Sequence, residues 1–418
     1  MLLKKILNSS EAQIVTLLLL ITGLAPAISV LYTGRESFDD AVLVMYEIAE
    51  ESPSFTFISR VLNFFIGLLL LMIIKKIITK RIYLTKRIKN LFLSFIVFLI
   101  FNYGISSIFG TYPGPPTIYF ILCNVVLILL TLISGPTPEI LIHQFKIISF
   151  IMLFGTLIWA IFLPDTAYFT FMEESVIEEK RLIGFFNHPR QLGVVALFLL
   201  AMELRIIIRG WLHIFIVLVA AVTLIMSISK TAIILGSIYI YWHVQNRNKF
   251  HFIILLGLTF IAYLLLTTLY PDLLSSSNDV DLTSMTGRDV IWKTVIDSWS
   301  SNPLFGNGPT YFMDRIHISF INAHNIFLQC LSDGGLLGLL ALFIYLFALI
   351  DLAIQNRSAS NNVSISLVLL LFLFSLTEMI MRLDNFVTGN FYINAFLITY
   401  LCALDRARCQ HAYQITKE

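Results

Sequence analysis

Apolar stretches long enough to cross a lipid bilayer recur along the whole of this sequence, and this feature limits its possible folds more than any other. About 20 residues of helix cross the hydrocarbon core of a membrane. Hydrophobic residues make up 58% of the 418 residues and charged residues only 13%, a composition that excludes a water-soluble globular fold. Because lipid offers backbone N–H and C=O groups no hydrogen-bond partner, each crossing is expected to be an α-helix.

The hydropathy pattern predicts an all-α integral membrane protein with about twelve transmembrane helices, formed as a single polytopic domain over residues 1–418. The longest connection, residues 271–332, follows the ninth of these helices and is expected to form a large loop. The expected helices lie at residues 12–32, 58–79, 90–108, 117–134, 147–164, 190–209, 211–228, 230–246, 251–270, 333–355, 363–382 and 389–404.

The distribution of charge predicts the orientation of the chain. With the N-terminus in the cytoplasm, 18 of the 28 Lys and Arg residues fall in cytoplasmic segments, whereas 20 of the 26 Asp and Glu residues fall on the outer side. Lys and Arg follow the positive-inside rule, so both termini are predicted to be cytoplasmic. The basic run at 75–89 is interpreted as a topology anchor, and the alternative is a site for lipid headgroups. No basic tail indicates binding to nucleic acid.

Function is expected in the long outer segments, because loops on a rigid scaffold often carry it. Within the loop at 271–332, residues 289–299 place apolar and small side chains at helical spacing, which predicts a short amphipathic helix against the membrane or over the bundle. Pro303, Gly306 and Gly308 are expected to form a turn after it. The side chains on the predicted buried face are Val290, Ile291, Thr294, Val295, Ser298 and Trp299.

Basic residues are few on the outer side, and three of them lie at predicted helix ends. Arg190 and Lys230 begin the sixth and eighth helices, and Arg288 begins the helix of the long loop. Guanidinium and ammonium groups at such places suit a phosphate or diphosphate. The alternative is that these side chains extend to the membrane interface without binding a ligand.

His324 is the candidate catalytic residue that the sequence marks most sharply. A neutral imidazole can take a proton from a hydroxyl near physiological pH, and the alternative is a structural loop histidine. His188 precedes Pro189, which is an ordinary helix-start signal, and it is interpreted as non-catalytic. Glu378 and Arg382 lie one turn apart and are interpreted as an ion pair that satisfies itself. No spacing typical of metal ligands is present in the sequence.

Several ordered motifs resemble the O-antigen ligase and polymerase superfamily. They are Arg181-Leu-Ile-Gly184-Phe-Phe-Asn187-His188-Pro189, Thr286-Gly287-Arg288-x-x-Ile291-Trp292, Asn302-Pro303-Leu304-Phe305-Gly306-x-Gly308 and Ala323-His324-Asn325. The pair His324-Asn325, followed after nine residues by Gly335-x-x-Gly338, is similar to the histidine motif of the ligases. The resemblance covers residues 181–340, and the first 165 residues match in hydropathy alone.

The resemblance implies a glycosyltransferase of the bacterial inner membrane that works on the periplasmic face in lipopolysaccharide biosynthesis, without a metal or another cofactor. The donor would be a glycan on undecaprenyl diphosphate, and the surrounding partners would be membrane lipids. A ligase transfers the glycan to the lipid A core, and a polymerase transfers it to a second lipid-linked repeat unit. The histidine motif favours the ligase.

The resemblance also implies roles for single residues. His324 would act as the base or position the acceptor, supported by Asn325, Gly335 and Gly338. Arg288 would contact the diphosphate and belong to the catalytic set, and Arg190 and Lys230 would supply further positive charge. Two positions depart from the family pattern: Ser229-Lys230 stands for Ser-Arg, which keeps the charge but loses the bidentate fork, and Asn187-His188-Pro189 stands for Asn-Pro.

A transporter for lipid-linked glycans is the alternative from a different functional class. Transporters usually have paired halves with similar hydropathy and polar residues near the membrane midplane. This sequence has neither feature, since its polar residues gather at the outer ends of the predicted helices. The transporter is therefore the less favoured interpretation.

Overall fold

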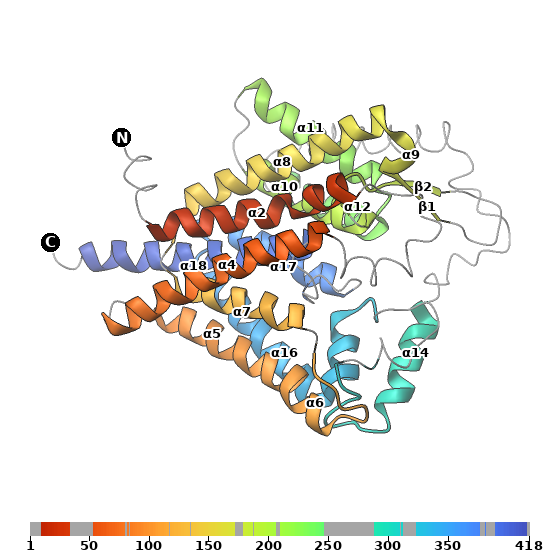
Figure 1. The fold of residues 1–418 in the computed structure, drawn as a ribbon. Helices are drawn as coiled ribbons and strands as arrows, with labels where there is room; N and C mark the ends of the chain where they lie inside the picture. Colours follow the sequence, from red (N-terminus) through yellow and green to blue (C-terminus); the bar gives the residue numbers. More distant parts are fainter. Residues whose placement is uncertain are drawn as a thin grey trace. The chain divides into compact units, whose positions relative to one another are not determined.

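The fold is described from a computed structural model of the chain (Figure 1). The residues that the structure describes are 10–33, 53–79, 82, 84–116, 118–133, 135–171, 179–186, 188–205, 210–245, 288–309, 311, 323–376, 381 and 389–415.

Helices dominate these residues. The helices are α2 (Ser10–Thr33), α4 (Pro53–Ile78), α5 (Lys86–Leu99), the π-helix η1 (Ile100–Ile105), α6 (Ser106–Phe109), α7 (Ile118–Leu132), α8 (Pro138–Phe162), α9 (Pro164–Ala167), α10 (Pro189–Arg205), α11 (Trp211–Met226), α12 (Lys230–Gln245), α14 (Arg288–Trp299), α16 (Ile326–Gln355), α17 (Val363–Ser375) and α18 (Gly389–Ile415). The strands β1 (Tyr168–Phe171) and β2 (Glu179–Leu182) form an antiparallel hairpin.

Length and composition make this a multi-pass membrane protein. Within the described ranges, five helical stretches are long and apolar enough to cross a bilayer. These stretches are Glu11–Leu31, Arg60–Ile78, Lys86–Phe109, Pro138–Phe162 and Ile326–Gln355. Shorter apolar helices occupy Phe120–Leu132, Trp211–Met226, Thr231–Tyr241 and Val363–Ser375. Each of these nine stretches overlaps a predicted transmembrane helix, and the predicted helix at 251–270 lies outside the described residues.

Several helices differ from their predicted extents for clear physical reasons. α8 begins at Pro138 rather than near residue 147, because Pro138 and Glu139 form a favourable first turn. α18 continues to Ile415, well past the predicted end near residue 404, because its last turns are polar and hydropathy does not register them. The β1–β2 hairpin lies between the predicted helices at 147–164 and 190–209, and its register pairs Tyr168 with Leu182.

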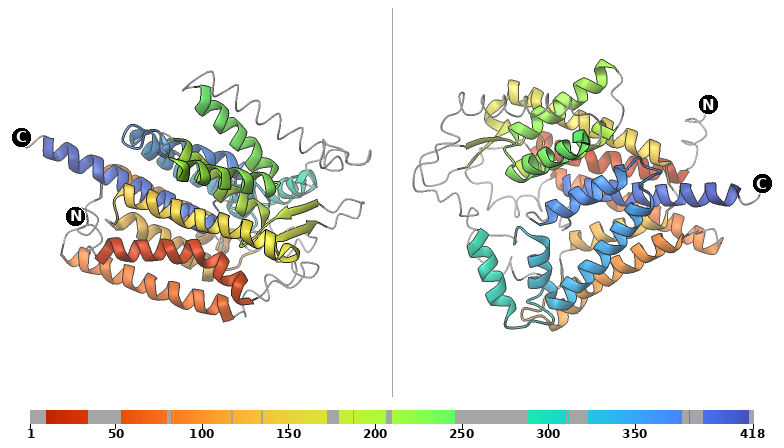
Figure 2. Two further views of the ribbon diagram at one scale, coloured as in Figure 1. Left: turned by 90° about the horizontal axis from the view of Figure 1, so that it is seen from above. Right: turned by 180° about the vertical axis from the view of Figure 1, so that it is seen from behind.

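The described residues form two compact units, and each is considered by itself. The first unit contains α2 to α7, α8 as far as Ser149, and the chain from Val290 in α14 to the end of α18. In this unit α2 packs on α4 (Figure 2), α16 packs along α5 and η1, and α18 packs on α7 and α2. Phe145 stacks on Tyr392 with ring centroids 5.1 Å apart, which fixes α8 against α18.

The second unit runs from Phe150 in α8 through α12. Its centre is α10, which is buried along most of its length between α11 and α12. Glu203 of α10 is fully buried and its carboxylate lies 2.5 Å from Nδ1 of His213 on α11. Burial of a carboxylate is costly unless it is paired, so this contact fixes how α10 and α11 pack.

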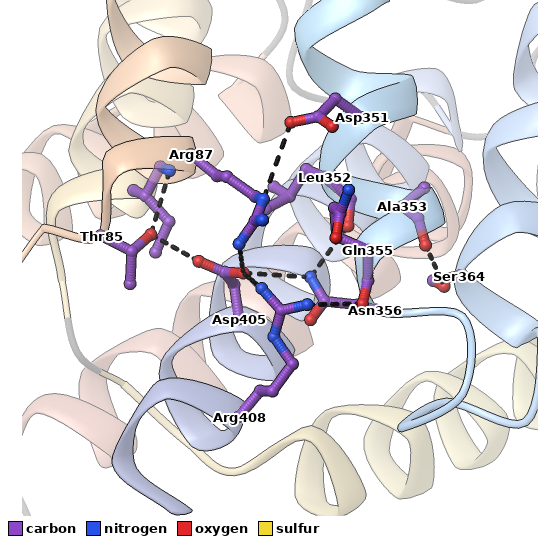
Figure 3. Close-up of polar contacts among 11 residues, drawn as sticks. Thr85, Arg87, Asp351, Leu352, Ala353, Gln355, Asn356, Ser364, Asp405 and Arg408 are labelled. Carbon is purple, nitrogen blue, oxygen red and sulfur yellow. Dashed lines mark hydrogen bonds and ion pairs between the residues drawn. The ribbon is translucent and has the colours of Figure 1, made fainter. Parts of the chain in front are cut away.

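A charged network fixes the C-terminal end of α16 in the first unit (Figure 3). Asp405 of α18 is fully buried and accepts hydrogen bonds from the hydroxyl of Thr85 and from Arg408, the latter at 3.0 Å. Arg87 lies 3.8 Å from both Asp405 and Asp351. The guanidinium of Arg408 also donates to the carbonyl of Gln355 at 2.6 Å. α5, α16 and α18 are therefore held together at this end.

Candidate active site

The glycine motif that follows His324 forms a sharp kink in α16. Gly335 has φ 63° and ψ −156°, and it interrupts the regular helix inside Ile326–Gln355. A Cβ atom at this position would lie 2.4 Å from the carbonyl oxygen of Leu304. Glycine is required here both by the positive φ and by the close approach of another backbone.

The loop 302–308 docks into this kink through backbone hydrogen bonds. A kinked helix leaves amides and carbonyls without their usual partners four residues away, and the loop supplies replacements on both sides of Gly335. The amides of Asn307, Gly308, Leu336 and Leu337 donate to the carbonyls of Ser332, Asp333, Pro303 and Leu304 at 2.6, 3.0, 2.9 and 3.3 Å respectively. The motif at 302–308 and the glycine motif at 335–338, which are separate in the sequence, are thus joined by backbone hydrogen bonds.

Gly338 allows the π-helix η1 to approach α16. A Cβ atom on Gly338 would lie 2.6 Å from Oδ1 of Asn102, and Nδ2 of Asn102 donates to the Gly338 carbonyl at 2.9 Å. Asn102 is fully buried. π-Helical turns often mark functional sites, and this one presents Asn102 to the glycine motif. Sequence reasoning missed Asn102, although an asparagine inside an apolar predicted helix was a visible signal.

α14 attaches the long loop to the residue before His324. Ile291 and Val295 are buried with Ala323 in one apolar cluster, and Nε1 of Trp292 donates to the Ala323 carbonyl at 3.0 Å. The structure therefore brings the Arg288-containing motif to the His324 motif. Arg288 is the first residue of α14, and its side chain lies outside the described residues. Thr294, which the spacing places on the same face, is exposed.

His324 lies in a tight turn immediately before α16. Its φ is +49°, a left-handed conformation that non-glycine residues adopt only where their surroundings hold it, and its side chain is half-buried. Asn325 is the N-cap of α16, where Oδ1 accepts from the amides of Phe327 and Leu328 at 2.9 and 3.1 Å. Nδ2 of Asn325 donates to the carbonyl of Leu376 at 2.8 Å. The position of the histidine is thus fixed by three separate segments.

Arg190 and Lys230 each lie in the first turn of one of two packed helices in the second unit. At Gly193, a Cβ atom would lie 3.0 Å from the Cβ atoms of Ser229 and Ala232, so the first turns of α10 and α12 are in contact. Arg190 is half-buried, and Lys230 is the first residue of α12 with a side chain outside the described residues.

His188 has a capping role at the start of α10. Its Nδ1 accepts from the amide of Arg190 at 3.1 Å, and the helix begins at Pro189 as predicted. Nδ1 thus partners an amide that the first turn leaves unsatisfied. Glu378 and Arg382, which were predicted to form an ion pair, lie outside the described residues.

Comparison with known families agrees with the motifs. Residues 214–343 match the family model described as O-antigen ligase, a range that includes Lys230, Arg288, His324, Gly335 and Gly338 but not Arg190. No curated protein matches the chain. The match confirms the superfamily resemblance predicted from the sequence: over residues 214–343 the chain is similar to the O-antigen ligase family.

Proposed function

We propose that this protein is an O-antigen ligase that transfers a glycan from undecaprenyl diphosphate to a hydroxyl group of the lipid A core. The observation that carries the proposal is the geometry at His324. Three segments fix its backbone, while its side chain remains half-buried and so accessible. A rigidly held histidine with an accessible ring is what proton transfer to or from a bound substrate requires.

In the proposed reaction, the oxygen of the acceptor hydroxyl forms a bond to the anomeric carbon of the glycan. The bond from that carbon to the diphosphate breaks, and the diphosphate leaves with the electron pair. The imidazole of His324 takes the proton of the hydroxyl, because a neutral imidazole is the side chain suited to this step near neutral pH. Arg288, at the start of α14, is the proposed contact for the leaving diphosphate.

Arg190 and Lys230 are proposed to bind the diphosphate as well. The contact between the starts of α10 and α12 supports this role, because the N-terminus of a helix carries partial positive charge that attracts phosphate. Two such ends side by side, each with a basic residue in its first turn, form a favourable anion site. We propose that charged side chains replace a metal in this reaction, which is therefore metal-independent.

The proposed site lies on the periplasmic side of the bacterial inner membrane. This placement follows from the predicted topology of about twelve crossings, with both termini in the cytoplasm and the loop 271–332 in the periplasm. The membrane lipids would hold the donor by its polyprenyl tail while the headgroup reaches the outer ends of the helices.

A polymerase that joins lipid-linked repeat units is the alternative function. It uses the same donor and the same leaving group, so the residues named above would keep their roles. The difference lies only in the acceptor, which would be a sugar hydroxyl of a second carrier-linked unit rather than the lipid A core.

The function can be tested with purified protein in lipid vesicles that contain an undecaprenyl-diphosphate oligosaccharide, with and without lipid A core. Mass analysis of the glycan products is the measurement, and a parallel reaction contains EDTA. Product that forms only with lipid A core, at an unchanged rate in EDTA, is expected for a metal-independent ligase. Elongation of the carrier-linked chain without lipid A core would instead identify a polymerase, and no product with either acceptor would favour the transporter.

Matched variants assign the chemistry to residues. His324→Ala and Arg288→Ala are each expected to abolish most of the transfer while the protein still inserts into the membrane. The controls are His411→Ala and Arg357→Ala, which make the same changes at exposed positions of α18 and of the turn after α16. Transfer at the wild-type rate in both His324→Ala and Arg288→Ala would contradict the proposed roles.

A further inference from the structure

Ala323, the residue that precedes His324, is held from two sides by side chains. The amide N–H of Ala323 donates to Oε1 of Gln329 at 2.9 Å, and its carbonyl accepts from Trp292 at 3.0 Å. Ala323 is fully buried, so these side chains take the place of water. Both polar groups of the residue next to the strained His324 backbone are therefore fixed in direction.

Gln329 is in turn oriented by Asp333, one helical turn further along α16. Nε2 of Gln329 donates to Oδ1 of Asp333 at 2.8 Å, and each side chain is only 1% exposed. A backbone N–H can only donate and a carboxylate can only accept. The amide of Gln329 therefore has one possible orientation, with its oxygen toward Ala323 and its nitrogen toward Asp333.

Asp333 also lies at the place where the loop 302–308 docks. Its backbone carbonyl accepts from the amide of Gly308 at 3.0 Å, and Gly334 and Gly335 follow it directly. A continuous set of contacts thus runs from the docked loop through Asp333 and Gln329 to the N–H group of Ala323, next to His324. Every member of this set is part of the first unit.

We propose that Gln329 and Asp333 are positioning residues that hold His324 in the geometry needed for glycan transfer, an inference that rests on the proposed function. Burial of a carboxylate and an amide is unfavourable, and apolar residues of similar volume would fill the same space without that cost. The pair instead fixes the direction of the Ala323 N–H group, and so holds the chain immediately before His324, whose left-handed backbone is not favoured by itself.

Exchange of the two functional groups tests the pair. Gln329→Glu places two carboxylates face to face, which breaks the contact and is expected to lower kcat by about 100-fold, the loss typical of a small misplacement of a catalytic group. Asp333→Asn alone keeps an acceptor for Gln329 and is expected to have a smaller effect. In the double variant Q329E/D333N, the introduced carboxylate accepts from Ala323 and from the introduced amide, so the hydrogen-bond pattern returns.

The double variant is expected to recover kcat to within about threefold of wild type, since residues in one hydrogen-bond network couple strongly. The change should appear in kcat with little change in KM for the donor. Gln355→Glu makes the same substitution at an exposed position of the same helix and is expected to leave kcat and KM unchanged. If the double variant is as slow as Gln329→Glu while all variants unfold at the wild-type temperature, the pair does not position His324.

Hydrogen exchange separates this inference from the proposed function. The amide of Ala323 is expected to be protected in wild type and in the double variant, and to exchange faster in Gln329→Glu. If wild-type protein transfers no glycan to any acceptor, the proposed function is wrong, and this exchange pattern would still support the pair as the device that fixes the His324 turn. Equal protection in all three proteins would overturn the pair whether or not transfer is observed.

Discussion

The two ends of α16 are both fixed by polar contacts, but they are built from different groups. At the C-terminal end the contacts are between charged side chains, with the buried carboxylate of Asp405 among Thr85, Arg87 and Arg408 (Figure 3). At the N-terminal end the backbone is contacted by neutral side chains, chiefly Asn325 and the amide of Gln329, which the carboxylate of Asp333 orients. One end of α16 is thus fixed by charged groups and the other mainly by backbone groups and neutral side chains.

The difference shows how a fixed structure can still offer a reactive group. At the C-terminal end each charged group lies against a group of opposite charge, so the network holds α5, α16 and α18 together and presents no separate group to a substrate. At the N-terminal end the hydrogen bonds of Ala323 and Asn325 hold the backbone on both sides of His324. We infer that the first arrangement serves stability and the second serves chemistry.

The largest expected effect is the loss of glycan transfer when His324, at the N-terminal end of α16, is replaced. His324→Ala is expected to lower the rate of glycan transfer by roughly 10²- to 10⁴-fold, the contribution typical of a general base, with an unfolding temperature close to wild type. Product formation in vesicles measures the transfer rate, and thermal unfolding in detergent measures the unfolding temperature. A loss of stability as large as the loss of activity would mean that His324 is structural. The N-terminal end of α16 would then not be the reactive end.

Asp405→Ala is expected to have the opposite pattern. Removal of the buried carboxylate takes away the acceptor of Thr85 and Arg408. Hydrogen bonds to a charged group contribute roughly 1.5–3 kcal/mol each, so the unfolding temperature should fall strongly. The protein that remains folded should transfer glycan at the wild-type rate. Asp351→Ala is the control, because its carboxylate is 52% exposed and 3.8 Å from Arg87, and such exposed pairs contribute about 0–1 kcal/mol.

Gly335→Ala tests the kink that separates the two ends. The added Cβ atom would meet the Leu304 carbonyl at 2.4 Å in a backbone with positive φ, and we expect a loss of about 2–4 kcal/mol together with a loss of transfer. Gly67→Ala on α4 is the matched control, since a Cβ atom added there would have no neighbouring atom within 4 Å. Normal stability in Gly335→Ala would show that the docked loop adapts, and the kink would then not define the site.

Hydropathy and motif spacing predicted the parts of this fold that depend on nearby residues. The apolar helices, the start of α10 at Pro189 and the turn near Gly306 and Gly308 follow from local patterns. The order of the motifs around His324 was also visible, and it indicated the family that the match at residues 214–343 supports. These features are local because each depends on a few neighbouring residues and on the lipid environment.

The contacts that complete the site could not be predicted in this way. Asn102 donates to Gly338 across 236 positions of sequence, and nothing in a single sequence relates the two residues. The π-helical turn that presents Asn102 has no composition of its own, so hydropathy assigns it to one regular helix. Gln329 lies in the segment predicted to be a loop, and Asp333 lies at the predicted start of the tenth helix, whereas α16 begins at Ile326. Only the structure shows that the two side chains connect to Ala323.

One substitution made at both ends of α16 gives the finest test of the comparison. Asn325 is the N-cap, and Asn325→Asp keeps the acceptor oxygen for Phe327 and Leu328 while it adds negative charge where the helix dipole favours it. Its stability is expected to stay within about 0.5 kcal/mol of wild type, because the lost donation to Leu376 is offset by this gain.

Asn356 lies at the other end, where the same change is expected to be unfavourable. It is fully buried, and its Nδ2 donates to the Leu352 carbonyl at 2.8 Å and lies 3.5 Å from Oδ1 of Asp405. Asn356→Asp replaces this donor with a carboxylate beside Asp405 and at the negative end of the helix dipole, so we expect a loss of roughly 2 kcal/mol. Thermal unfolding of the two variants side by side measures the difference. Equal losses would mean that charge does not distinguish the ends of α16, and the division between an anchoring end and a reactive end would then rest on His324 alone.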